Sequence, residues 1–160
     1  MRKQKGFSLI ELLIVVAIIL IIAAIAIPNL LRSRIAANQA SAVGSLRTLN
    51  TAEITYSSTY NVGFTFNMPY LAPPTTAGAN PTSTAAGLID SVLAGGSKSG
   101  YSFTYSPGAS DTTGRINTYS FIAVPITSST GTNYYYTDQS GVIRQNSTTT
   151  AGSTDSPIAG

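Results

Sequence analysis

The sequence is dominated by one segment near its N-terminus, FSLIELLIVVAIILIIAAIAI, residues 7–27. Only Ser8 and Glu11 interrupt its apolar character. As an α-helix this segment would measure about 31 Å at about 1.5 Å per residue, which matches the hydrocarbon thickness of a bilayer. The residues before it, MRKQKG, carry three of the chain's nine basic side chains. We therefore expect one membrane-spanning helix whose basic end stays on the cytoplasmic side.

Two simple interpretations of this segment stay open. A secretory signal peptide would be cleaved at a small-x-small site, and Ala24-Ile25-Ala26 provides one. A plain membrane anchor would carry Glu11 as a tolerated polar residue near the interface. The carboxylate argues against both, because an ionised group in hydrocarbon is costly and normally has a partner.

The residues around position 7 resemble a known processing signal. The string is Lys5-Gly6-Phe7-Ser8-Leu9-Ile10-Glu11-Leu12-Leu13, and the resemblance continues through Ile27-Pro28-Asn29 and Ala36-Ala37-Asn38. It is similar to the type III signal of type IV pilins and of the pseudopilins of type II secretion systems. The resemblance implies that a membrane prepilin peptidase cuts between Gly6 and Phe7, removes the leader 1–6 and methylates the new amine of Phe7.

Glu11 acquires a role in this interpretation. Cleavage would place the positive amine of Phe7 four residues before Glu11, on the same face of the helix. The resemblance implies that the carboxylate of an incoming subunit neutralises the amine of its neighbour and sets the axial register of a filament. Methylation would leave the amine charged. The alternative is a protonated Glu11 that is hydrogen-bonded within its own helix.

The helical pattern continues after the apolar segment. Pro28 ends the apolar run at residue 28 and is expected to kink the helix, because proline removes a backbone hydrogen bond. The resemblance implies that Pro28 acts in filament assembly together with Phe7 and Glu11. Apolar residues then recur in steps of three, four and seven: Leu31, Ile35, Ala42, Leu46, Leu49, Tyr56 and Tyr60. Residues 29–60 are therefore predicted to be the amphipathic half of the helix that starts with segment 7–28.

Residues 61–160 are expected to form a small globular head. The stretch 61–83, rich in glycine, proline, asparagine and threonine, is predicted to be a loop, and a short helix is predicted over 84–93. Alternating patterns then predict strands, at residues 101–105, 117–126, 132–137 and 142–144. The predicted fold class is α+β and pilin-like, with the long helix packed on an antiparallel sheet of three to four strands.

The end of the chain is biased towards hydroxyl side chains. Serine and threonine fill seven of the ten positions 147–156. We expect this tail to be exposed and mobile. Because the chain has no cysteine, the disulfide that closes this region in many pilins cannot form, and packing and hydrogen bonds must hold it.

Composition argues against several classes of protein. The chain has no histidine and no cysteine, so it lacks the commonest general base and any thiolate ligand. Its six acidic residues are widely spread. We therefore predict no enzyme activity, no cofactor and no metal site. Outside the leader, the chain has six basic and six acidic residues. This balance of charge gives no support for nucleic-acid binding.

These observations together predict a structural protein. The prediction is a type IV pilin subunit that is held in the bacterial inner membrane, processed after Gly6 and polymerised into a helical surface filament for adhesion or motility. Its partners would be copies of itself, membrane lipid, a prepilin peptidase and the assembly machinery. The alternative is a major-type pseudopilin of a type II secretion system, which would build a periplasmic pseudopilus. The N-terminal motif is common to both; the sparse acidic residues and the hydroxyl-rich tail favour the pilin.

Overall fold

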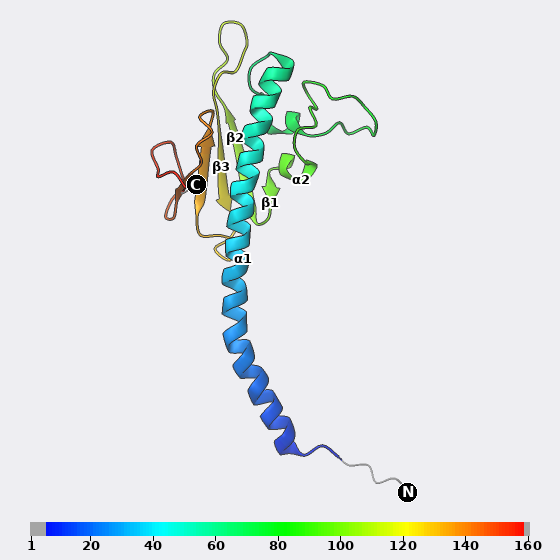
Figure 1. The fold of residues 1–160 in the computed structure, drawn as a ribbon, viewed down its shortest axis with the longest axis vertical. Coiled ribbons are helices and arrows are strands. Elements are labelled where there is room, and N and C mark those ends of the chain that lie inside the picture. Colours follow the sequence, from blue (N-terminus) through cyan, green and yellow to red (C-terminus); the bar gives the residue numbers. More distant parts are fainter. Residues whose placement is uncertain (1–5, 159–160) are drawn as a thin grey trace. The chain divides into compact units, whose positions relative to one another are not determined.

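The structure is a computed structural model that describes residues 6–158 (Figure 1). Of the expected leader, 1–6, only Gly6 falls within the described residues. The chain divides into two compact units, Met1–Arg34 and Ile35–Gly160, and each is described by itself. Helix α1, Leu9–Tyr60, contributes to both units.

The first unit contains the apolar half of α1. Pro28 stands inside the helix without ending it. The large apolar side chains from Phe7 to Leu31 are between 45% and 82% exposed. Their exposure means that this part of the helix has no covering layer in its own unit, which leaves its apolar surface for another environment.

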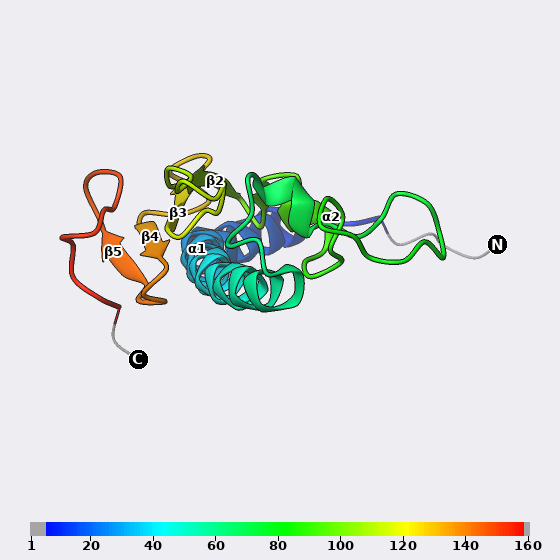
Figure 2. The ribbon, with the colours of Figure 1, turned by 90° about the horizontal axis from the view of Figure 1, so that it is seen from above.

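The second unit is an α+β head. Its sheet has five strands in the order β1-β2-β3-β4-β5, and every neighbouring pair is antiparallel. The strands are β1 (Ser97–Lys98), β2 (Tyr101–Pro107), β3 (Tyr119–Pro125), β4 (Tyr134–Asp138) and β5 (Arg144–Asn146). Two short helices precede the sheet, η1 (Met68–Leu71) and α2 (Ser91–Ala94). Figure 2 shows β4 and β5 on one side of α1 and α2 on the other.

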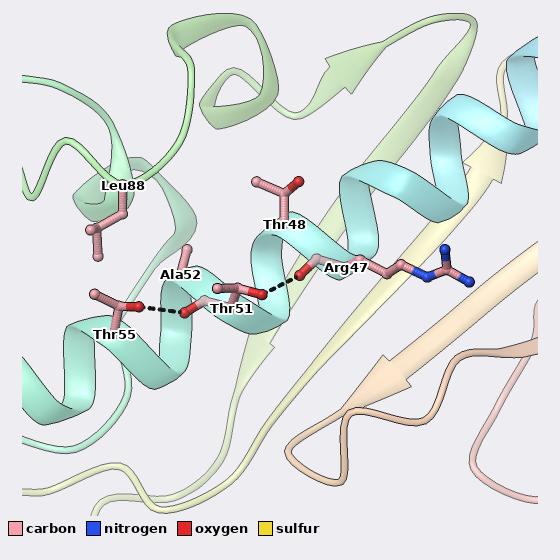
Figure 3. Close-up of a pocket in the computed structure, with 6 residues that line it drawn as sticks. All are labelled: Arg47, Thr48, Thr51, Ala52, Thr55 and Leu88. Carbon is pink, nitrogen blue, oxygen red and sulfur yellow. Dashed lines mark hydrogen bonds between the residues drawn. The ribbon is translucent and has the colours of Figure 1, made fainter. Parts of the chain in front are cut away.

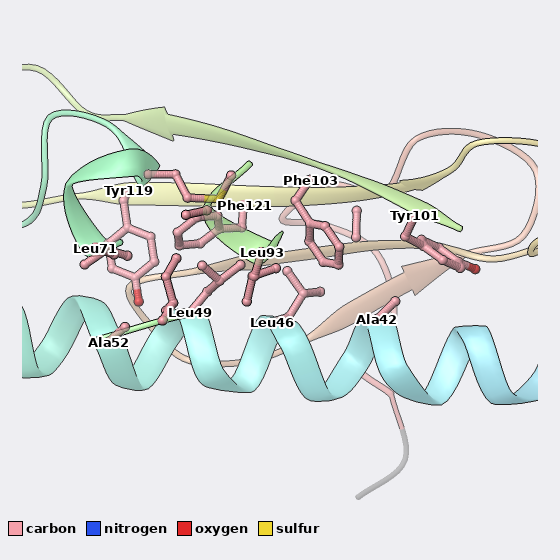
Figure 4. Packing of buried hydrophobic residues seen from close by; sticks show 14 of the residues in the cluster. Ala42, Leu46, Leu49, Ala52, Leu71, Leu93, Tyr101, Phe103, Tyr119 and Phe121 are labelled. Atoms are coloured by element: carbon pink, nitrogen blue, oxygen red, sulfur yellow. The ribbon is translucent and has the colours of Figure 1, made fainter. Parts of the chain in front are cut away.

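The core lies between α1 and one face of the sheet. The helix contributes buried residues at helical spacing, which include Ala42, Leu46 and Leu49. The strands contribute alternate residues, because successive side chains point to opposite faces. Figure 4 shows this packing for Ala42, Leu46, Leu49, Ala52, Leu71, Leu93, Tyr101, Phe103, Tyr119 and Phe121. The register that pairs Tyr105 with Phe121 also brings their rings together in a tilted arrangement, with centroids 4.8 Å apart.

The predicted sheet and short helix need correction. The sheet has five strands in the described residues, because Ser97–Lys98 folds back onto β2 through a turn at Ser99 and Gly100 that sequence patterns did not reveal. The helix predicted over 84–93 is only the single turn Ser91–Ala94. The preceding residues instead donate backbone hydrogen bonds to the 70–72 segment, for example from Leu88 to Leu71 at 2.8 Å.

The hydroxyl-rich tail is partly anchored. Its residues 147–150 are exposed, as expected, but Ala151 is buried. Backbone hydrogen bonds then tie it along β5, from Gln145 to Ser156 at 3.0 Å and from Ile158 to Ile143 at 2.9 Å. Most of the tail is therefore exposed as expected, including Ser153, Thr154 and Ser156, while Ala151 is buried and local hydrogen bonds that composition cannot reveal hold the chain near Ser156.

A close approach at Gly131 allows a first prediction. Tyr101 is fully buried and its hydroxyl donates to the carbonyl of Asn133 at 2.8 Å, and a Cβ on Gly131 would lie 2.6 Å from its Cζ atom. Gly131→Ala should therefore lower the free energy of unfolding by about 1–3 kcal/mol, the usual cost of overpacking. Urea denaturation can measure this on a fragment starting at Asn29, which contains every residue of the core cluster.

The matched control for this change is Gly152→Ala. Nothing lies within 4 Å of a Cβ at Gly152, so its unfolding free energy should stay within about 0.5 kcal/mol of the original. Equal effects of the two substitutions would show that the contact with Tyr101 does not limit the size of residue 131.

Candidate functional site

The bond expected to be cleaved lies just before α1. Gly6, Phe7 and Ser8 are outside any helix or strand, and all three are exposed. The Phe7 side chain is 82% exposed, and nothing lies within 4 Å of a Cβ at Gly6. The peptide bond between Gly6 and Phe7 is thus in a non-helical, accessible segment, the kind of site that a peptidase can bind.

Glu11 makes a hydrogen bond at the start of α1. Its Oε2 atom accepts from the backbone N–H of Ser8 at 2.9 Å. Ser8 directly precedes the first helical residue and Glu11 is the third, so the pair has the spacing of a capping box. The carboxylate also lies in the first turn, where the helix dipole favours negative charge. The sequence analysis missed this role, although the pattern Ser-x-x-Glu indicates it.

This hydrogen bond matters for the two interpretations of Glu11, as an ionised group that pairs with an amine or as a protonated group bonded within its own helix. The Ser8 N–H needs an acceptor oxygen, which a carboxylate provides without being protonated. Only Oε2 has a described partner, so Oε1 is free of hydrogen bonds within the described residues. Glu11 is thus hydrogen-bonded within its own helix and still has an oxygen that can bind a cation nearby.

Helix α1 is the one helix in the described residues that is long and apolar enough to cross a membrane. The part that meets this criterion is not buried. Pro28, expected to act in assembly, lies in α1 one residue after the apolar run, and Arg32 and Arg34 follow it, both exposed. The predicted site residues therefore do not converge on one pocket: Phe7 lies before α1, Glu11 lies in its first turn, and Pro28 lies within it.

A buried carboxyl group in the head was not singled out from the sequence. Glu53 on α1 is fully buried, and Thr65 donates to it twice, from its backbone N–H to Oε2 at 2.9 Å and from its hydroxyl to Oε1 at 2.5 Å. The hydroxyl of Tyr105 on β2 donates to the Thr65 carbonyl at 2.6 Å. Glu53 thereby connects α1, the loop after it and the sheet.

Burial dominates the electrostatics of this carboxyl group. Desolvation raises the pKa of Glu53, and the hydrogen bonds from Thr65 oppose the rise only in part. Burial also raises the pKa of the Tyr105 and Tyr119 hydroxyls, and the charge of Glu53 is the second cause of this rise. The single salt bridge of residues 6–158 joins Lys98 to Asp90, so no described cation pairs with Glu53.

A second buried link lies one turn earlier on α1. The Asn50 amide donates to the Thr137 hydroxyl on β4 at 2.8 Å, and it accepts from the Tyr119 hydroxyl on β3 at 3.1 Å. Asn50 and Glu53 follow Leu46 by four and seven residues, so they lie on the apolar face. A polar residue at an apolar position of the stripe was the signal that could have revealed both.

Hollows lie beside α1 in the described part of the head. The one shown in Figure 3 has a volume of about 300 Å³ and is lined by Arg47, Thr48, Thr51, Ala52, Thr55 and Leu88. The hydroxyls of Thr51 and Thr55 donate to backbone carbonyls of their own helix, at 3.0 and 2.9 Å. No group of three acidic residues able to hold a metal occurs within the described part of the chain.

Comparison with known proteins addresses the N-terminal part of the chain. Residues 1–27 match the family model of the prokaryotic N-terminal methylation motif. The chain is 68% identical over 38 residues to the type IV wide pilus major component PilA4 of Thermus thermophilus. It is 48% identical over 56 residues to the type IV major pilin protein PilA of Myxococcus xanthus. It is 44% identical over 52 residues to the type II secretion system core protein G of Vibrio cholerae.

These matches cover 24%, 35% and 32% of this chain, and 29%, 26% and 36% of the respective relatives. The chain thus matches little more than a third, at most, of these three relatives' lengths. No solved structure matches the chain.

The fold and the motif together define a class. The chain is an α+β protein with a long N-terminal helix on an antiparallel sheet and a prepilin-type methylation motif at residues 1–27. Its N-terminal region carries this motif and is similar to that of type IV pilins and of a type II secretion system core protein, which agrees with the resemblance noted from the sequence.

The buried carboxyl group gives the head an unusual dependence on pH. The pKa of Glu53 is raised in the folded state above its ordinary value of about 4.3. Its contribution to stability is therefore fully present below about pH 4.3 and is lost as the pH rises through the folded pKa. Glu53→Gln removes the ionisable group and should gain stability relative to the original protein as the pH rises from about 4 to 8.

Urea denaturation of the fragment starting at Asn29 checks this. The control is Asp90→Asn, because a hydrogen bond from Lys98 holds the pKa of Asp90 below its ordinary range. The stabilising contribution of Asp90 is present above the ordinary aspartate pKa of about 3.9 and is lost only as the pH falls below it. The stability difference between that variant and the original protein should therefore stay nearly constant from about pH 4 to 8. Parallel pH profiles for Glu53→Gln and the original would mean that Glu53 ionises as easily in the fold as in the unfolded chain.

Proposed function

We propose that this protein is a type IV pilin subunit, held in the inner membrane by the apolar half of α1 and then polymerised into a helical surface filament. The observation that carries the proposal is the exposure of that apolar surface in a chain with a prepilin-type motif. The capped helix start and the accessible Gly6–Phe7 bond support processing at this position.

The physical reason is the cost of leaving the apolar half of α1 in water. Burying one Leu or Ile side chain contributes about 1.5–3 kcal/mol. More than a dozen such side chains are exposed between Phe7 and Leu31. Before assembly, lipid would cover them; after assembly, the same half of α1 from neighbouring copies would do so. The chain therefore has a storage state in the membrane and a working state in a bundle.

The divisions of the chain follow from this proposal. A prepilin peptidase would remove the leader 1–6, whose basic residues stay cytoplasmic, and would methylate Phe7. Segment 7–28 would span the membrane and later form the filament core. Segment 29–60 would carry the head, 61–160, on the outside of the membrane. The assembly machinery would supply the motors, and the subunit itself would act as a structural protein.

Glu11 would set the register between subunits. In the cleaved chain, the Phe7 amine of one subunit would meet the Glu11 carboxylate of another in a dry bundle. The hydrogen bond from Ser8 uses one carboxylate oxygen and holds the side chain near the helix start. A pre-oriented carboxylate loses little conformational freedom when it binds the amine, which favours pairing.

A second candidate function is supported by the similarity to the type II secretion system core protein G. In that case the same subunit would build a short periplasmic pseudopilus. Immunolabelling of intact cells separates the two, because a surface pilus is accessible to antibody and a periplasmic pseudopilus is not.

Processing can be tested directly on assembled material. N-terminal sequencing should begin at Phe7, with a methylated amine. Gly6→Val should block maturation, because its side chain would occupy a peptidase subsite that accepts glycine, and the unprocessed chain should accumulate in membranes. A sequence beginning at Ile27 would instead demonstrate ordinary signal cleavage.

The role of Glu11 is tested by Glu11→Leu. Removing one partner of a buried ion pair costs about 3–5 kcal/mol, so the variant should insert into the membrane and be cleaved but assemble poorly. Glu11→Gln should be less impaired, since its amide oxygen still accepts from Ser8. Filament number and length, measured by electron microscopy, check this. Normal filaments from Glu11→Leu would contradict the pairing.

A further inference from the structure

Two arginines follow the apolar half of α1 without a counter-charge. Arg32 and Arg34 are both exposed. The single salt bridge within residues 6–158 lies in the head and involves neither of them. The sequence has no acidic residue between Glu11 and Glu53, so this part of α1 itself offers no partner. The two guanidinium groups are therefore available to bind an anion from elsewhere.

The position of these arginines along α1 corresponds to the headgroup layer of a bilayer. The apolar run ends at Ile27, so Arg32 and Arg34 follow it by about 7.5 and 10.5 Å along the helix axis. A bilayer with an apolar core about 30 Å thick has about 5–7 Å of polar headgroups on each side. Arginine side chains are long and flexible enough to reach back across the remaining distance.

The distribution of the two arginines around α1 also fits a lipid layer. They are two residues apart, which places them on opposite sides of the helix, about 200° apart, with a difference in depth of about 3 Å. A groove of one protein partner covers only one side of a helix, whereas headgroups surround it. The first side-chain hydrogen bond from α1 to the head comes later in the described residues, from Asn38 to the Thr130 carbonyl at 2.9 Å.

The carboxylates of a second copy are less suited to these arginines. Every acidic side chain of the described head already accepts hydrogen bonds: Glu53, Asp90, Asp111, Asp138 and Asp155. In Asp138, for example, the Ser140 N–H donates to Oδ1 at 2.9 Å and the Tyr136 hydroxyl to Oδ2 at 3.3 Å. In the proposed function, Glu11 pairs with the Phe7 amine. A phosphate outside the protein is therefore a better partner than a carboxylate of another copy.

We infer that Arg32 and Arg34 bind the phosphates of anionic phospholipids in the headgroup layer on the non-cytoplasmic side of the membrane. The inference rests on the proposed function, because it concerns the subunit while it is stored in lipid. A guanidinium group stays charged and binds phosphate through two parallel hydrogen bonds. The two contacts fix the depth of α1 in the membrane, and withdrawal of the subunit into a filament has to break them.

Lipid selectivity around the helix tests this inference. Because the chain has no cysteine, the full-length variant Ala36→Cys carries one fluorophore, two residues after Arg34. It is inserted into vesicles of equal parts phosphatidylcholine and phosphatidylglycerol, in which one or the other lipid bears a nitroxide quencher near the top of its acyl chain. Quenching should show roughly five-fold enrichment of phosphatidylglycerol beside the label, the effect of one arginine near an anionic surface. Equal quenching by the two lipids would overturn the inference.

Substitutions then assign the enrichment to the two arginines. Arg32→Gln/Arg34→Gln should bring the ratio close to one, whereas Arg32→Lys/Arg34→Lys should keep most of the enrichment, because the charge remains. The matched control is Arg47→Gln, which removes an exposed arginine further along the same helix and should leave the enrichment unchanged. Enrichment that persists in the glutamine variant would show that another group attracts the anionic lipid, and the inference would be wrong.

Flotation and filament counts separate this inference from the proposed function. A full-length protein that does not float with the vesicles has no membrane-held state, which overturns the proposed function and the inference together. If the protein floats but shows no enrichment, only the contact between the arginines and phosphate is overturned. If the glutamine variant keeps the enrichment but makes few filaments, the arginines act on another subunit and not on lipid.

Discussion

One constraint governs this molecule: the apolar half of α1 has no covering layer in its own unit. Hydrophobic burial is the dominant favourable term in folding and association, and here a large part of it can be realised only outside the chain. Lipid and the helices of other copies are both apolar, so transfer between them changes the burial little. In the proposed function, the free-energy difference between the membrane and the filament would then depend on packing and on polar groups such as Glu11, which lipid cannot pair.

The head solves the opposite problem, because it must be stable without help from neighbours. It has no disulfide to restrict its unfolded state, and in the described residues it replaces that restraint with buried polar links from α1 to the sheet. Every buried side-chain nitrogen or oxygen of the described part has a hydrogen-bond partner. Satisfied networks of this kind specify one arrangement of helix and sheet, since any slip of Asn50 or Glu53 leaves a polar group unpaired.

Sequence patterns predicted the helix and strands whose apolar residues repeat at a regular spacing. The apolar run, the amphipathic stripe and the strand alternation produced α1, β2, β3 and β4 close to their observed bounds. The patterns failed where a single long-range contact decides the local structure. Ser97–Lys98 becomes a strand because β2 returns beside it, and residues 86–89 are not helical because the 70–72 segment accepts their backbone hydrogen bonds. Glu53 escaped notice for the same reason, since Thr65 and Tyr105 reach it only in the folded head. Glu11 is different, because its capping contact with Ser8 is local and the pattern Ser-x-x-Glu indicates it.

The head has few charged residues, so each free charge has a large effect on how the head contacts another molecule. A filament core of apolar helices can slide or rotate at little cost, because hydrophobic contact has no preferred direction. In the proposed filament, directional contacts would therefore define how one subunit is placed on the next. With Asp90 paired and Asp111 and Asp155 engaged locally, few charged groups of the head are left to do so. A surface rich in serine and threonine adds no competing charges, so each remaining free charge of the head can favour a single placement over its alternatives.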